Sequence, residues 1–114
     1  MAKEFRIYTR VYEPEVHWAA VKVPGTSLGF GLFACRDQGK SINPERRWKI
    51  TDIDSGAAIF DLEMPKVPLR FVSLAECKEW VANIPEEYKA KIEAIRSSEK
   101  YKQLCQDFAN LPKE

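Results

Sequence analysis

The hydrophobic period of this chain changes once, between residues 63 and 73, and this change constrains the fold more than any other feature. Residues 5–12 place every second side chain on the same side, which is the pattern of a strand with two different faces. From Ser73 onward, apolar residues recur at helical spacing instead. The sequence therefore predicts an α+β fold. We expect an antiparallel meander of four to five strands over about residues 4–63, followed by two to three C-terminal helices packed on one sheet face.

Turn-forming residues divide the first part of the chain into strands. Pro24-Gly25 is expected to turn the chain after the second strand, and Gly29 and Gly31 to mark a bulge or a close backbone approach inside a central strand. Ser55-Gly56 is expected to make the clearest hairpin turn. The expected strands are 5–12, 16–23, 28–34, 47–54 and 57–62, with a short edge strand at 69–72.

Capping residues set the helix boundaries. Ser73 and Glu76 form a capping box, which predicts a helix that ends near Asn83. A second helix follows Pro85. Its apolar stripe shifts in phase at Ser97-Ser98, so either the helix bends there or Ser98 caps a third helix.

Composition predicts one folded intracellular domain spanning residues 1–114. The chain has 45% hydrophobic residues and a net charge of +1, unlike a disordered segment. Its three cysteines form no C-x-x-C pair, which favours reduced thiols. Because no secretory signal or apolar membrane span is present, we expect a cytoplasmic protein that does not bind membranes.

Three sequence patterns point toward chemistry, and each fits poorly. Residues 29–34 match G-x-G-x-x-A, but no strand-turn-helix surrounds them. Asp52, Asp54 and Glu63 match calcium-loop positions 1, 3 and 12, but the glycine falls at position 5 instead of 6. His17 with Cys35 would be a nucleophile pair only if the fold joined them. We therefore expect no catalytic residue, no metal and no cofactor.

The alternation in the first strand gives the best functional clue. Phe5, Ile7, Thr9 and Val11 share one face, while the other face carries Arg6, Tyr8, Arg10 and Tyr12. Interleaved Arg and Tyr can stack on rings and bind carboxylates or phosphates. We expect the C-terminal helices to cover the opposite face, because helices at one end of the chain cover only one side of a sheet.

A second basic group surrounds the polar loop after the third strand, and it would join the Arg/Tyr face if the strands formed one sheet. Residues 1–50 hold nine Lys/Arg against five Asp/Glu, whereas residues 51–114 hold nine against twelve. The group comprises Arg36, Lys40, Arg46, Arg47 and Lys49, and Trp18 and Trp48 add aromatic surface.

These residues predict a small non-enzymatic binding protein that acts on a protein partner, as an inhibitor or adaptor of the kind that phages and mobile elements encode. Tyr, Trp and Arg dominate protein interfaces. One alternative is a nucleic-acid-binding module that uses the same surface, although the charge is modest for that role. A second is a small enzyme with a site near His17 and Cys35. A third alternative is that Tyr8 and Tyr12 pack under the C-terminal helices and have only a structural role. If the Arg/Tyr face is exposed, it could also form the interface of a homodimer.

Overall fold

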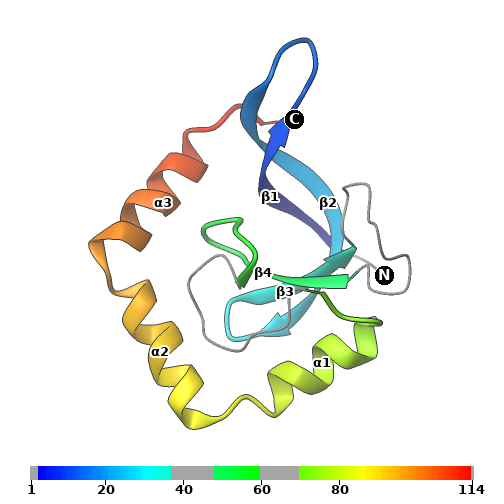
Figure 1. Ribbon diagram of the computed structural model, residues 1–114, viewed down its shortest axis with the longest axis vertical. Coiled ribbons are helices and arrows are strands. Elements are labelled where there is room, and N and C mark those ends of the chain that lie inside the picture. The colour runs from blue at the N-terminus through cyan, green and yellow to red at the C-terminus, as the bar shows by residue number, and fades with distance from the viewer. Residues whose placement is uncertain (1–2, 37–47, 60–69, 114) are drawn as a thin grey trace.

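A four-stranded antiparallel sheet followed by three helices confirms the α+β fold (Figure 1). The computed structural model describes residues 3–36, 48–59 and 70–113. The strands lie in chain order, so each pairs with its sequence neighbour. Their bounds are β1, Lys3–Val11; β2, His17–Gly29; β3, Leu32–Arg36; and β4, Trp48–Asp52.

The helices begin where the capping residues predict. Helix α1 spans Leu74–Ala82, and the Ser73 hydroxyl accepts from the Glu76 amide at 3.1 Å. The Glu76 carboxylate accepts from the Val72 amide, not from that of Ser73. Helix α2 spans Glu86–Arg96. Helix α3 spans Glu99–Ala109 and is capped by Ser98, so the phase shift marks a separate helix. None of the described helices is long and apolar enough to cross a membrane.

The expected turn at Pro24-Gly25 is wrong, because β2 runs through both residues. Pro24 pairs with Glu4. The register places its nitrogen on the edge facing away from β1, where the missing N–H removes no bond to that strand. Gly25 is explained by crowding: a Cβ there would lie 2.9 Å from the Phe5 ring and 3.0 Å from the Ala34 carbonyl oxygen.

The expected central strand over 28–34 is also wrong, because a tight turn interrupts it. Gly29, Phe30 and Gly31 have φ angles of 83°, 56° and 73°. Positive φ at successive residues is incompatible with an extended strand, and the two glycines make it accessible here. They therefore form the turn of the β2–β3 hairpin, and Phe30 stands at its end. The strand expected over 57–62 is described only as far as residue 59. In this part, Ala58 forms a single β-bridge with Thr51 of β4.

The helices cover the same sheet face that carries Arg6, Tyr8 and Arg10. The expectation that they cover the face opposite these residues is therefore wrong. In the register of β1 and β2, Tyr8 lies opposite Ala20, so the two side chains share a face. Thr26 lies six residues beyond Ala20 on the same face of β2, and it pairs with Ala34 of β3. Ala34 belongs to the core between sheet and helices. That core contains Leu32, Ala34, Ile50, Ile59, Phe71, Cys77 and Ile92.

The second sheet face is buried by the sheet itself, since β1 approaches the turn that follows β4. The Tyr8 amide donates to the Gly56 carbonyl oxygen at 2.8 Å. Ile7, Val23, Phe33 and Cys35 form a second buried cluster on this face, where the Phe5 and Phe33 rings stack at 4.3 Å. Within the described residues, the curvature of the sheet therefore lets these side chains shield one another from solvent.

Gly56 is the residue on which this closure depends most directly. Its φ is +67°, and a Cβ would clash with the Phe108 ring and lie 2.9 Å from the Tyr8 amide nitrogen. Gly29 also has positive φ, but a Cβ there meets nothing within 4 Å. We expect Gly29→Ala to cost about 1 kcal/mol for the backbone alone, and Gly56→Ala about 1–3 kcal/mol more from overpacking. If urea denaturation showed that the two variants lose the same unfolding free energy, the close packing of Gly56 against Phe108 and Tyr8 would be contradicted.

Burial of Cys77 predicts alkaline destabilisation. Desolvation, with a smaller contribution from Glu76, raises the pKa of the Cys77 thiol from 9.0 to about 12. The folded state thus holds this proton more tightly than the unfolded state does, so its stabilising effect is complete below pH 9.0 and is lost between pH 9.0 and about 12. We expect the unfolding free energy to fall by about 1.4 kcal/mol per pH unit from this group. Urea denaturation at several pH values should show that the unfolding free energy of Cys77→Ala falls less steeply with pH above 9.0 than that of the wild type. An equally steep fall in both proteins would show that Cys77 is not the group responsible.

Candidate functional site

A buried carboxylate at the end of β4 has the densest polar contacts in the described chain. Asp52 is fully buried, and its Oδ1 accepts from Arg96 Nη2 at 2.8 Å and Nε at 3.2 Å. Its Oδ2 accepts from the Tyr101 hydroxyl at 2.6 Å, and from the amide and hydroxyl of Ser55 at 3.0 and 2.8 Å. We call Asp52, Ser55, Arg96 and Tyr101 the Asp52 network.

The chemistry of the Asp52 network is that of a structural junction. Both carboxylate oxygens already receive donors, and no solvent reaches Asp52, so the carboxylate is not placed to take a proton from a substrate. Desolvation raises the pKa of Tyr101, and the hydrogen bond to Asp52 raises it further. The phenol therefore remains a proton donor to Asp52 at neutral pH. Arg96 also lies over the Phe30 ring at 5.1 Å, which joins the β2–β3 hairpin to α2.

The sequence singled out Asp52 for a different reason. The sequence matched Asp52, Asp54 and Glu63 to a calcium loop. In the structure both carboxylate oxygens of Asp52 accept hydrogen bonds within the Asp52 network, Asp54 is exposed, and Glu63 lies outside the described residues. Arg96 and Tyr101 are 44 and 49 residues away from Asp52. No local spacing links residues so distant, so sequence patterns gave no signal for this junction.

Removing the positive charge from the network should destabilise the fold. Arg96→Met would leave a buried carboxylate without its counter-charge, and we expect a loss of about 3 kcal/mol in chemical denaturation. Lys91→Met is the matched control, because Lys91 is exposed on the same helix and should change stability by less than about 0.5 kcal/mol. Similar losses for both variants would show that the ion pair contributes little.

Two members of the predicted Arg/Tyr face make contacts inside the fold. Arg6 Nη1 donates to the Ala20 carbonyl oxygen at 2.8 Å. The Tyr8 ring lies between Trp18, at 5.3 Å edge-on, and Phe108 of α3, at 6.0 Å and nearly parallel. Tyr8 therefore packs under a helix, as the structural alternative expected for both tyrosines.

The other two members lie at the free end of the β1–β2 hairpin. Tyr12 is 67% exposed, and Arg10 lies over the Trp18 ring at 4.9 Å. Val16 and Trp18 are 61% and 47% exposed. We call Arg10, Tyr12, Val16 and Trp18 the hairpin-end patch. Figure 1 shows the loop between β1 and β2 projecting beyond α3, with the C-terminal end of the chain beside this hairpin.

The described members of the second basic group, Arg36 and Lys49, lie away from this patch. Arg36 lies over Trp48 at 5.9 Å, and its neighbour Cys35 pairs with Gly25. Gly25 and Trp18 are seven residues apart on β2, or roughly 20 Å along a strand. Lys49 lies on β4 opposite Cys35, and the remaining predicted members of this group, Lys40, Arg46 and Arg47, lie outside the described residues.

His17 and Cys35 are likewise kept apart. His17 lies at the hairpin end, where its Nδ1 is 2.8 Å from the Glu15 carbonyl oxygen, whereas Cys35 is fully buried in the second cluster. The two residues therefore have no direct route for a shared proton. Among the residues that the structure describes, no three His, Cys, Asp or Glu side chains gather as metal ligands would.

Comparisons with protein-family models, curated proteins and solved structures find no match to this chain.

Proposed function

We propose that this protein is a non-enzymatic binding protein that contacts a protein partner through the hairpin-end patch. One observation carries the proposal. Of the four large hydrophobic side chains exposed in the described chain, Tyr12, Val16 and Trp18 lie together in this patch, and only Val72 lies elsewhere. Exposed apolar side chains that cluster, unlike scattered ones, are typical of interaction sites.

The composition of the patch supports this function. Trp, Tyr and Arg are the residues most enriched at the energetic centres of protein interfaces. The Trp18 ring is also held by packing, because it contacts the Tyr8 ring, which stacks on Phe108 of α3. The Ala20 amide donates to the Pro112 carbonyl oxygen at 2.9 Å, which fixes β2 against the C-terminal segment. A preorganised aromatic anchor loses less conformational entropy on binding than a mobile one does.

The cations of this face favour a protein over a nucleic acid. Arg6 bonds to a backbone carbonyl, and Arg10, which lies over Trp18, is the one cation among the four residues of the patch. Binding to a nucleic-acid backbone draws on several Lys and Arg contacts to phosphate and weakens steeply with salt. A protein partner instead requires an apolar anchor bordered by a few polar groups.

The test is affinity capture with the tagged full-length chain, followed by measured binding of the purified partner. We expect Tyr12→Ala with Trp18→Ala to weaken binding at least tenfold, which corresponds to about 1.4 kcal/mol. Val72→Ala is the control, because Val72 is 50% exposed outside the patch. Both variants should still unfold in one cooperative urea transition, although the double variant should have a lower midpoint because Trp18 packs on Tyr8.

Three results would contradict the proposal. Partner binding that the double variant leaves unchanged would place the interface elsewhere. Failure to capture any partner would remove the support for a protein-binding role. Tight binding of a single-stranded oligonucleotide that declines steeply with salt, and that Arg10→Ala weakens, would favour the nucleic-acid alternative.

A further inference from the structure

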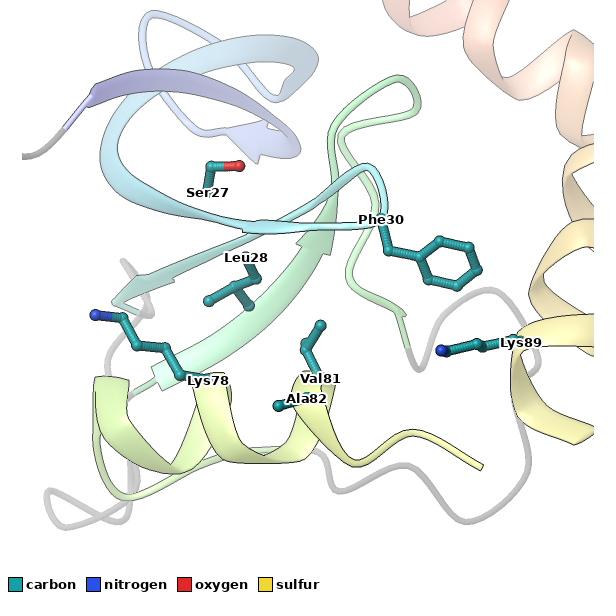
Figure 2. Close-up of a pocket in the computed structure, with 7 residues that line it drawn as sticks. All are labelled: Ser27, Leu28, Phe30, Lys78, Val81, Ala82 and Lys89. Carbon is teal, nitrogen blue, oxygen red and sulfur yellow. The ribbon is translucent and has the colours of Figure 1, made fainter. Parts of the chain in front are cut away.

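A groove of about 630 Å³ lies between the end of the β2–β3 hairpin and helices α1 and α2, on a different part of the molecule from the hairpin-end patch. Figure 2 shows Leu28 facing Val81 across the groove and Phe30 extending toward Lys89. The lining residues are Ser27, Leu28, Phe30, Lys78, Val81, Ala82 and Lys89.

The groove is apolar in its middle and positively charged at its margins. Leu28, Phe30 and Val81 supply apolar surface, and all three are half-buried. Lys78 lies at one side and Lys89 at the other (Figure 2). An occupant must therefore present an apolar group with negative charges around it.

Both lysines are available to such an occupant. Lys78 is exposed and makes no salt bridge within the described part of the chain. Lys89 lies 3.6 Å from Glu86, whose side chain is 90% exposed. An exposed i,i+3 pair of this kind contributes only a few tenths of a kcal/mol, so exchanging Glu86 for a partner carboxylate costs little.

The openness of the groove favours a macromolecular occupant over a small molecule. None of its seven lining residues is fully buried. Small-molecule sites enclose most of the ligand surface, which this groove does not do. A side chain from a second protein needs no enclosure, because the rest of that protein covers the groove.

One wall of the groove is held rigidly. Phe30 has a φ of 56°, which is uncommon for a bulky residue, and its ring lies beneath the Arg96 guanidinium at 5.1 Å. Arg96 is itself fixed by Asp52. The Asp52 network therefore holds the hairpin end in the position that forms the groove.

We propose that this groove binds an acidic peptide segment of a partner protein, with one large apolar side chain between Leu28 and Val81 and flanking carboxylates on Lys78 and Lys89. The proposal is independent of the hairpin-end patch.

The experiment selects binders to the full-length chain from a displayed library of random peptides. The strongest binder is synthesised with a fluorophore, beside a copy in which glutamine and asparagine replace its acidic residues. Fluorescence anisotropy then compares the wild type with Lys78→Glu plus Lys89→Glu. The charge-matched control is Lys91→Glu plus Lys102→Glu, since both of these lysines are exposed and outside the groove.

We expect the selected peptides to be acidic around an apolar residue. Reversing both groove lysines should weaken binding at least tenfold, the control should change it less than threefold, and the amide copy should bind at least tenfold more weakly. Tyr12→Ala with Trp18→Ala should bind the peptide as the wild type does, which separates this proposal from the preceding one.

Several outcomes would overturn the groove assignment. Selection of neutral or basic peptides, equal effects of the two lysine pairs, or loss of binding in the hairpin variant would each do so. A selection without binders would also overturn it. Finally, succinate or inorganic phosphate shifting the methyl resonances of Leu28 and Val81 at submillimolar concentration, with no peptide binding, would identify a small anion site instead.

Discussion

The buried carboxylate of Asp52 is the constraint on which the rest of this structure depends. A charge with no access to water is stable only when other groups replace its hydration. Here those groups come from the turn after β4, the end of α2 and the start of α3. Satisfying one carboxylate therefore fixes how two helices meet the sheet, and the stacking of Arg96 on Phe30 adds the β2–β3 hairpin to the same junction.

The curvature of the sheet solves a second problem. Four strands with large apolar side chains on both faces would leave one face in water if helices covered only the other. The bond from the Tyr8 amide to the Gly56 carbonyl oxygen brings the two ends of the sheet together, and the enclosed side chains bury one another. Because Phe108 packs directly on Gly56 and Tyr8, helix α3 covers this closure from outside.

These two constraints also determine which surfaces remain for partners. Closure of the sheet buries Ile7, Val23, Phe33 and Cys35, and Phe108 of α3 stacks on Tyr8 of the Arg/Tyr face. Among the described residues, the surfaces that we propose for partners are the hairpin end, where β1 and β2 extend past the helices, and the groove beside Phe30. Both surfaces are supported by packed residues, which suits binding without large rearrangement.

The sequence alone determined the local features of this protein: the α+β order, the Ser73 cap, and the alternation that separates Ile7 from Tyr8. It left two possibilities at Ser98, and the structure shows that Ser98 caps a third helix. Each depends on neighbours within a few residues, so spacing and side-chain type suffice. Only the tertiary structure decided that Pro24 and Gly25 continue a strand, that the helices cover the Arg/Tyr face, and that Asp52 meets Arg96 and Tyr101. These outcomes depend on strand edges, sheet curvature and contacts between residues more than forty positions apart. Such contacts leave no periodic trace in a single sequence, because nothing near Asp52 specifies which distant donors will replace its water.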